Sequence, residues 1–245
     1  MAEGVSVTRA GLRLACRRRT GRGPAIVFLP GYGSDMEGSK ALALDEWAAR
    51  SGRAMVRFDY AGCGASEGRF ADGTLESWRD DALAVIEALA PGPLVLVGSS
   101  MGGWIALLVA KALAGQVTAV VGIAAAPDFT DWGYGDAEKA TIAAEGRLLQ
   151  PSLYTDEPTL TTRAFWESGQ RQRLMGSGIP IDCPVRLLQG QNDPEVPWRL
   201  ALDLAGALRS ADVQTVLVKH GDHRLSRPQD IALLIATIEA LPETP

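Results

Sequence analysis

The stretch that decides the fold is residues 94–104, which read Leu-Val-Leu-Val-Gly-Ser-Ser-Met-Gly-Gly-Trp. The leading apolar residues predict a buried strand, and the apolar run that begins at Trp104 predicts a helix. Between them stands the pattern Gly-x-Ser-x-Gly, centred on Ser100. A serine on a sharp strand-to-helix turn has a strained backbone, and side chains two residues to either side would collide, so both places need glycine. Ser100 is therefore the predicted nucleophile; a generic tight turn, which also favours glycine, is the alternative.

Strand and helix patterns alternate on both sides of this turn. Short apolar runs predict strands at residues 25–29, 55–59, 117–125, 185–188 and 213–218. Apolar positions at helical spacing predict helices at 39–50, 75–89, 101–113, from about 197 and from 228. Residues 5–7 and 12–16 alternate apolar and polar side chains, as in a hairpin. The pattern predicts an α/β fold with a mostly parallel central sheet and helices on both faces.

The alternation breaks once, between residues 128 and 184. This segment has no clear strand, yet it is rich in large apolar side chains. A structureless loop of that length is uncommon inside a compact domain. We therefore expect a single domain over residues 1–245, in which residues 128–184 form a helical insertion above the sheet, called the cap below. The length of 245 residues is sufficient for one large buried core.

Composition excludes several classes of partner. The chain has 24 basic and 29 acidic residues, and this mild net charge of −5 argues against nucleic acid, whose phosphates need a concentrated basic face. The three cysteines are scattered and there are only two histidines, so we expect no metal site and no cofactor. No apolar run reaches the roughly 18 residues that predict a membrane span. An odd number of scattered cysteines suits a reducing cytoplasm, and the N-terminus has no apolar region followed by a small-residue cleavage site. The N-terminal arginines at positions 9, 13, 17, 18, 19 and 22 could indicate a transit peptide, but the solvent face of a hairpin is favoured, so we expect a cytoplasmic protein.

A serine hydroxyl is a poor nucleophile until a base takes its proton, and a histidine oriented by a carboxylate is the expected base. His223 follows the predicted strand 213–218 and precedes the last helix. Sites in open α/β sheets gather at the carboxyl ends of strands, so His223 is the predicted base. His220 is the alternative, but it still belongs to the strand end, where it is expected to pack or to form local hydrogen bonds.

The acid is expected after the predicted strand 185–188, because the order along the chain in such sites is serine, acid, histidine. Asp193 stands there and is the predicted acid. Its near rival is Glu195, which can instead serve the dipole of the following helix. Asp222 is too close to the histidine in sequence, and Asp128 after strand 117–125 is a lesser alternative.

Two N–H donors are needed to stabilise a tetrahedral oxyanion. Met101, the residue after the predicted nucleophile, offers one backbone N–H. The other is expected from Tyr32, in the loop after strand 25–29; its ring either lines the acyl pocket or is structural. The glycine-rich run 59–66 lacks the ending of a P-loop and the spacing of a dinucleotide fingerprint, so it is interpreted as a structural turn. Cys63 within it is expected to be a buried or idle thiol.

The cap supplies the predicted substrate contacts. The apolar residues expected to meet the acyl group are Trp132, Leu149, Phe165 and Trp166. Three cap arginines either meet an anionic substrate or are solvated surface charges: Arg163, Arg171 and Arg173.

Six stretches carry a resemblance to a known family: Phe28–Tyr32, Arg57–Tyr60, Val97–Trp104, Cys183–Leu188, Val196–Trp198 and Lys219–Arg224. From about residue 12 onward the chain resembles the α/β-hydrolase superfamily, and within it the branch of mitochondrial palmitoyl-protein thioesterases that also cleave acyl glucuronides. The resemblance implies the α/β-hydrolase fold and a triad of Ser100, Asp193 and His223. Departures lie mainly in the cap, which shapes the substrate pocket.

The expected function is a serine hydrolase that cleaves carboxylic esters or thioesters through an acyl-enzyme on Ser100. The expected partner is a small-molecule acyl ester or thioester, or an acylated protein, and the sequence leaves the oligomeric state open. The alternatives within enzymes are a peptidase-like or carbon–carbon bond hydrolase with the same triad. From a different class, the alternative is a ligand-binding member of the fold that has lost catalysis.

Overall fold

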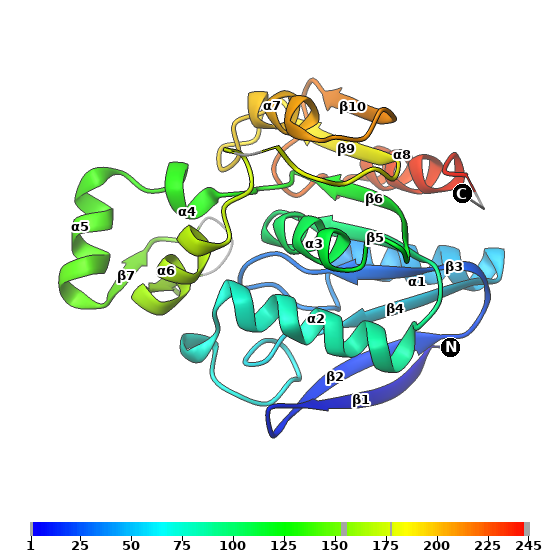
Figure 1. Cartoon of the computed structure of the whole chain (residues 1–245), viewed down its shortest axis with the longest axis horizontal. Helices are drawn as coiled ribbons and strands as arrows, with labels where there is room; N and C mark the ends of the chain where they lie inside the picture. The colour runs from blue at the N-terminus through cyan, green and yellow to red at the C-terminus, as the bar shows by residue number, and fades with distance from the viewer. Residues whose placement is uncertain (1, 153–155, 177, 243–245) are drawn as a thin grey trace.

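The computed structural model describes residues 2–152, 156–176 and 178–242. Within them an eight-stranded sheet runs in the order β1-β2-β4-β3-β5-β6-β9-β10 (Figure 1). Its strands are β1 (Glu3–Arg9), β2 (Leu12–Arg19), β3 (Arg22–Leu29), β4 (Arg53–Phe58), β5 (Leu94–Ser99), β6 (Val117–Ile123), β9 (Val185–Gly190) and β10 (Val213–Val218). The β1–β2 hairpin is antiparallel and joins β4 antiparallel, whereas all other neighbours pair in parallel. The predicted α/β architecture is confirmed.

Helices cover both faces of the sheet (Figure 1). On one face lie α1 (Ser39–Ser51) and α8 (Pro228–Glu239); on the other lie α2 (Leu75–Leu89), α3 (Met101–Ala112) and α7 (Arg199–Ala207). Strand β3 shows why the strands are apolar throughout. Ile26 and Phe28 pack into the cluster beneath α1 and α8, whereas Val27 and Leu29 pack into the cluster beneath α2 and α3. Because both faces of the strand are buried, alternation between apolar and polar residues is lost.

Local signals fix where several helices begin and end. Thr74 is the N-cap of α2 and forms a capping box with Ser77, in which each side chain accepts a hydrogen bond from the other residue's backbone N–H. Gly52 closes α1 in the left-handed conformation. Pro228 opens α8, where its missing N–H costs nothing. A short 3₁₀ helix, η1 (Phe70–Asp72), precedes α2.

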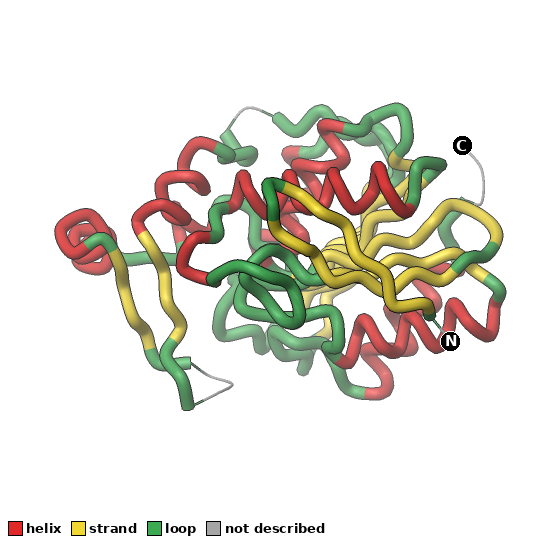
Figure 2. The backbone as a smooth tube through the Cα atoms, turned by 90° about the horizontal axis from the view of Figure 1, so that it is seen from below, coloured by secondary structure: helices red, strands yellow, loops and turns green. Residues whose placement is uncertain are grey.

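The cap contains helices α4 (Phe129–Trp132), α5 (Asp136–Glu145) and α6 (Arg163–Arg171). It also contains an antiparallel pair, β7 (Arg147–Gln150) with β8 (Thr159–Thr162), which stands away from the main sheet (Figure 2). The expectation that this segment has no strand is wrong in this respect. Each strand is only four residues long, and Arg147-Leu148-Leu149-Gln150 does not alternate, so the sequence pattern carries no strand signal.

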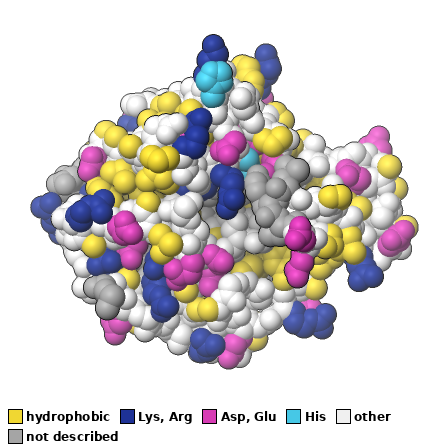
Figure 3. All heavy atoms as spheres, turned by 180° about the vertical axis from the view of Figure 1, so that it is seen from behind, with side chains coloured by type: hydrophobic (Ala, Val, Ile, Leu, Met, Phe, Trp, Pro, Cys, Tyr) yellow, Lys and Arg dark blue, Asp and Glu magenta, His cyan; other side chains and the backbone are white. Residues whose placement is uncertain are grey.

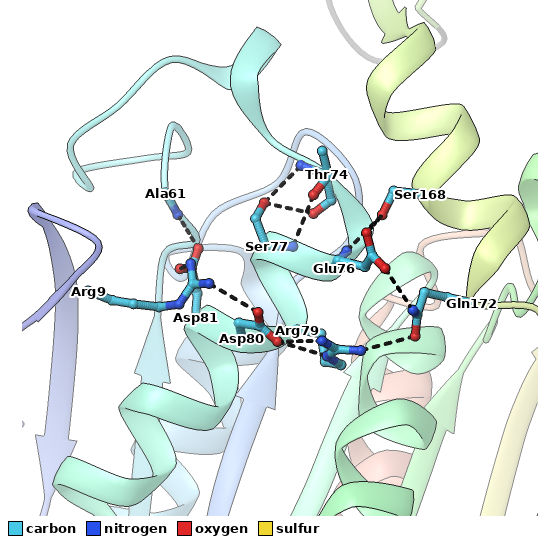
Figure 4. A network of polar contacts seen from close by, with 10 residues as sticks. All are labelled: Arg9, Ala61, Thr74, Glu76, Ser77, Arg79, Asp80, Asp81, Ser168 and Gln172. Carbon is cyan, nitrogen blue, oxygen red and sulfur yellow. Dashed lines mark hydrogen bonds and ion pairs between the residues drawn. The ribbon is translucent and has the colours of Figure 1, made fainter.

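The cap helix α6 is latched to α2 by polar contacts around Glu76 (Figure 4). The Glu76 carboxylate accepts hydrogen bonds from Ser168 and Gln172 and pairs with Arg171 at 2.7 Å. Arg79 of α2 donates to the Gln172 side chain at 3.1 Å. These contacts, called the latch below, hold the end of the cap against the main body of the protein.

The three cysteines are free, and burial raises the pKa of the Cys16 and Cys63 thiols to about 12 in each case. Cys63 lies in the glycine-rich turn after β4. Asp59 stabilises this turn, because the Asp59 carboxylate accepts the backbone N–H groups of Met36 and Ala65. The prediction of a buried thiol in a structural turn is confirmed. Across the described residues, none of the helices combines the length and apolarity that crossing a membrane requires.

Candidate active site

Ser100 sits on a strained turn between β5 and α3. Its φ of 54° and ψ of −120° lie in a region that residues with a side chain rarely adopt. Backbone hydrogen bonds hold it there: the Ser100 N–H donates to Ile123 at 2.9 Å, and the Ser100 carbonyl accepts from Gly103 and Ala126. The surrounding chain therefore over-determines the strained conformation, as expected of a serine presented for chemistry.

The glycines of the pattern are required by close approach of the backbone. A Cβ on Gly98 would lie 2.2 Å from the carbonyl oxygen of Gly102, and a Cβ on Gly102 would lie 2.0 Å from that of Leu29. Both distances are far below van der Waals contact, and the obstructing atoms belong to the backbone. The alternative of a generic glycine-rich turn does not explain a strained serine between two such positions.

His223 and Asp193 meet at the same edge of the sheet. Strands β5, β6, β9 and β10 are parallel, so their carboxyl ends all point toward the cap (Figure 1). The loops after β9 and β10 touch: Asn192 donates to the Gly221 carbonyl at 2.9 Å, and a Cβ on Gly190 would lie 2.4 Å from that oxygen. This close approach brings His223 Nδ1 to 2.8 Å from Asp193 Oδ2.

The Asp193 side chain is fully buried and its acceptor sites are occupied. Oδ1 accepts the backbone N–H groups of Glu195 and Val196, and Oδ2 accepts from Gln189 at 3.0 Å as well as from His223. Burial raises the pKa of this carboxyl, but the hydrogen bond and charge of His223 together with the two N–H groups outweigh it, so the pKa of Asp193 lies below its ordinary value. An ionised carboxylate only accepts hydrogen bonds, so Nδ1 donates to it, and Nε2 is the ring nitrogen left for proton transfer.

Gln189 was not singled out from the sequence. It is 1% exposed at the end of β9, in a run that is otherwise apolar apart from Arg186. Its side-chain N–H group donates to Asp193, which helps to fix the carboxylate. The signal that identifies it is a polar amide inside a buried strand a few residues before the acid.

The rival residues His220, Asp222 and Glu195 each have different surroundings. His220 is exposed, whereas His223 is 9% exposed, and Figure 3 shows one histidine standing out from the surface and one recessed. The Asp222 carboxylate accepts the N–H of Leu225. Glu195 faces the other ring nitrogen, with Oε2 at 3.9 Å from His223 Nε2, and the following helix starts only at Arg199. The expectation that Glu195 serves that helix is therefore not what the structure shows.

Asp128, the lesser alternative for the acid, has a structural place. It is buried in the left-handed conformation at the N-terminus of α4, with φ of 57°. Its two carboxylate oxygens accept the backbone N–H groups of Leu174 and Met175, at 2.8 and 2.9 Å. Asp128 thus ties the beginning of the cap to its end, and the carboxylate is not directed at His223.

The expected oxyanion donors flank Ser100. Gly31 is so close to the serine that a Cβ built on it would lie 3.4 Å from the Ser100 Cβ, which places the loop of Tyr32 beside the turn. Met101 is the first residue of α3, where backbone N–H groups lack partners within the helix. Among the residues that the structure describes, neither the Tyr32 nor the Met101 N–H is engaged in a hydrogen bond, and the Ser100 hydroxyl is likewise unengaged.

The Tyr32 side chain joins this loop to the cap. Its hydroxyl donates to the Leu160 carbonyl of β8 at 2.6 Å. Its ring packs against an aromatic cluster formed by Phe70, Trp78, Phe129 and Phe165, with ring centroids 4.7 to 6.0 Å apart. The structural interpretation of the ring therefore has direct support.

The predicted acyl contacts in the cap have different surroundings. Phe165 is 1% exposed within the aromatic cluster, and Leu149 is 52% exposed on β7. The indole N–H groups of Trp132 and Trp166 donate to the carbonyls of Pro127 and Thr130, both at 2.8 Å. Packing and hydrogen bonding explain these side chains without a ligand, and their contact with an acyl group stays a prediction.

The three cap arginines are used within the protein. Arg171 pairs with Glu76, and Arg173 pairs with Asp131 at 2.8 Å. Arg163 donates to the carbonyls of Ile142 and Ala143 near the end of α5. These partners favour the interpretation as surface charges over that of a site for an anionic substrate.

A strained serine after one parallel strand, and a hydrogen-bonded aspartate and histidine after two others, define a hydrolase of the α/β type. The model of the Alpha/beta hydrolase family matches residues 26–233, and this chain belongs to that family and is a hydrolase.

Individual proteins and solved structures are also similar to this chain. The chain is 41% identical to the human protein named "Palmitoyl-protein thioesterase ABHD10, mitochondrial" over 93% of this chain and 76% of that protein. The solved structure of mouse alpha/beta hydrolase domain-containing protein 10 has a TM-score of 0.92 and 40% identity, with 98% of each chain covered. A putative hydrolase from Agrobacterium vitis S4 also has a TM-score of 0.92, with 42% identity over 98% of each chain. The resemblance stated from the sequence is confirmed.

One expectation is overturned by these comparisons. The human, mouse and orangutan (Pongo abelii) relatives are all named as mitochondrial proteins. The prediction of a cytoplasmic protein is wrong on this finding, because close relatives point to the mitochondrion instead. Scattered free cysteines are typical of any reducing compartment and do not single out the cytoplasm.

Proposed function

We propose that Ser100, His223 and Asp193 form the catalytic triad of an acyl ester and thioester hydrolase. His223 Nε2 takes the proton of the Ser100 hydroxyl as the oxygen attacks the substrate carbonyl carbon. The ester or thioester bond then breaks, the proton passes from Nε2 to the leaving oxygen or sulfur, and the acyl group stays on Ser100. Water reverses the sequence and releases the acid. The observation that carries the proposal is the 2.8 Å contact from His223 Nδ1 to a fully buried, ionised Asp193.

The backbone N–H groups of Tyr32 and Met101 are proposed to stabilise the tetrahedral oxyanion. Gly31 packs directly against Ser100, and Met101 follows it at the start of α3. Both N–H groups are fixed by the backbone before substrate arrives, so they need no reorganisation when negative charge develops on the substrate oxygen. This preorganisation is what the strained turn achieves.

The proposed substrates are S-acyl thioesters and carboxylic esters with an apolar acyl chain. Support comes from the relatives named palmitoyl-protein thioesterases at 41 to 42% identity. We propose further that residues 1–245 act as one domain and that the cap borders the acyl site. The aromatic cluster beneath it joins the loop of Tyr32 to Phe129 and Phe165 of the cap. We propose that the acyl chain binds beside this cluster, because apolar surface leaves water on binding.

The test is the Ser100→Ala variant, assayed with p-nitrophenyl esters and S-acyl peptides of rising chain length. We expect kcat to fall on the order of 10⁴-fold or more while the circular dichroism spectrum and Tm stay those of the wild type. Labelling by a fluorophosphonate should be lost as well. Full labelling of this variant would contradict the nucleophile assignment, and a sharp preference for the shortest acyl chains would contradict the long-chain thioesterase proposal.

A further inference from the structure

Two carboxylates, two residues apart, contact opposite sides of one imidazole. Asp193 accepts from Nδ1, whereas Glu195 Oε2 lies 3.9 Å from Nε2 of His223. The backbone of Glu195 is held in place, because its N–H donates to Asp193 Oδ1 at 2.8 Å. The Glu195 side chain is 37% exposed, so the carboxylate borders both the imidazole and the solvent.

The position of Nε2 constrains the leaving group of the reaction. When the acyl-enzyme forms, the bond from the carbonyl carbon to the leaving sulfur or oxygen breaks, and that atom receives the proton from Nε2. The proton moves only over hydrogen-bond distance, about 3 Å. Combined with the 3.9 Å from Nε2 to Glu195, this places the leaving atom within about 7 Å of the Glu195 carboxylate. The substituents of the leaving group therefore enter the field of this charge.

We infer that Glu195 determines specificity for the charge of the leaving group. A leaving group with a negative charge next to the scissile bond is disfavoured, and one with a positive charge is favoured. In terms of chemical class, the carboxylate favours an S-acyl cysteine in a peptide with a neighbouring lysine or arginine. It disfavours a cysteine flanked by acidic residues and a leaving group that carries its own carboxylate. This inference rests on the proposed function.

The experiment uses one acyl chain and varies only the charge. Octanoyl thioesters are made on the cysteine of three short peptides, in which the neighbouring residues are lysine, glutamine or glutamate. The wild type should give kcat/KM in the order lysine, glutamine, glutamate. In Glu195→Gln the ratio of the lysine to the glutamate peptide should fall about threefold to tenfold, a range set by partial solvent screening of the charge.

Two controls separate this effect from a general loss of charge. Glu87→Gln removes the same charge at an exposed position in the last turns of α2, the end remote from the latch, and should leave the peptide ratio of the wild type unchanged. Raising the salt from about 20 mM to about 500 mM should compress the ratio of the wild type and change that of Glu195→Gln little. An equal ratio in the wild type and Glu195→Gln at low salt would overturn the inference.

Failure of this inference is distinguishable from failure of the proposed function. If Ser100→Ala hydrolyses the peptides as well as the wild type does, the triad itself is refuted. If Ser100→Ala is inactive and the wild type has the same kcat/KM for all three peptides, the triad stands and only the role of Glu195 is wrong.

Discussion

The turn around Ser100 and the cap both lie at the edge of the sheet where the parallel strands end, but they are held in place differently. The turn is fixed by backbone: Ser100 is held by main-chain hydrogen bonds, and Gly98 and Gly102 lie where a Cβ would strike a carbonyl oxygen. The cap is fixed by side chains, through the latch at Glu76 and the hydroxyl of Tyr32. The proposed nucleophile therefore stands on a rigid main-chain frame, whereas the cap is attached by side-chain contacts that can be removed one at a time.

The largest expected effect is the loss of activity when His223, the proposed general base, is replaced. Replacing His223 with Ala removes the group proposed to move the proton, so kcat should fall on the order of 10⁴-fold or more. His220→Ala is the matched control, since this second imidazole is exposed and three residues away; its kcat should stay within about twofold of the wild type. The measurement is hydrolysis of a p-nitrophenyl ester at saturating substrate. A folded but inactive His220→Ala together with an active His223→Ala would show that His220, not His223, is the base.

A smaller effect, on stability, tests the frame directly. Gly102→Ala puts a Cβ 2.0 Å from the Leu29 carbonyl oxygen, so the turn must shift. We expect a loss of about 1–3 kcal/mol in the free energy of unfolding, measured by urea denaturation, together with a fall in kcat because Ser100 moves with the turn. Gly115→Ala is the control, because a Cβ there meets nothing within 4 Å. Equal stability of the two variants would mean that the turn is not tightly packed.

The smallest effect is expected at the latch. Glu76→Gln removes the charge that pairs with Arg171 and weakens the acceptor for Ser168 and Gln172. Unfolding free energy should fall by about 0.5–1 kcal/mol, and KM for a long-chain ester should rise about twofold with kcat retained, since the triad is untouched. Glu87→Gln, at the other end of the same helix, should change neither value. A fall in kcat without any change in KM would show that the cap and the frame are not separable.

The features that the sequence could predict are those fixed by neighbouring residues or by the order of the strands. The strands, the helices and Ser100 follow from apolar periodicity and from a glycine pattern with one geometric purpose, so they are predictable from local sequence. His223 and Asp193 were predicted because the carboxyl ends of parallel strands share one edge. Each of these predictions needs only neighbours along the chain or the order of the strands.

The features that the sequence could not predict depend on contacts between residues far apart in the chain. Glu195 was expected to serve the next helix, but its carboxylate faces His223, 28 positions further along the chain, across the contact of two loops. The β7–β8 pair was missed because four-residue strands lack periodicity. The packing of Phe165 among aromatic rings from three other segments was not predicted either. No local pattern encodes these arrangements, because they are set by which loops the tertiary fold brings together.

The hydroxyl of Tyr32 has a consequence for how freely the cap can change. It binds the main-chain carbonyl of residue 160, and Asp128, Trp132 and Trp166 likewise bind main-chain groups. The Tyr32, Trp132 and Trp166 side chains donate to main-chain carbonyls, whereas Asp128 accepts main-chain N–H groups. Every amino acid offers the carbonyl and every amino acid except proline offers the N–H, so these bonds survive substitution of the partner residue. Many cap side chains can therefore be substituted while these main-chain bonds persist. If the cap borders the acyl site as proposed, substitutions in the cap can change substrate selectivity while the turn of Ser100 stays intact.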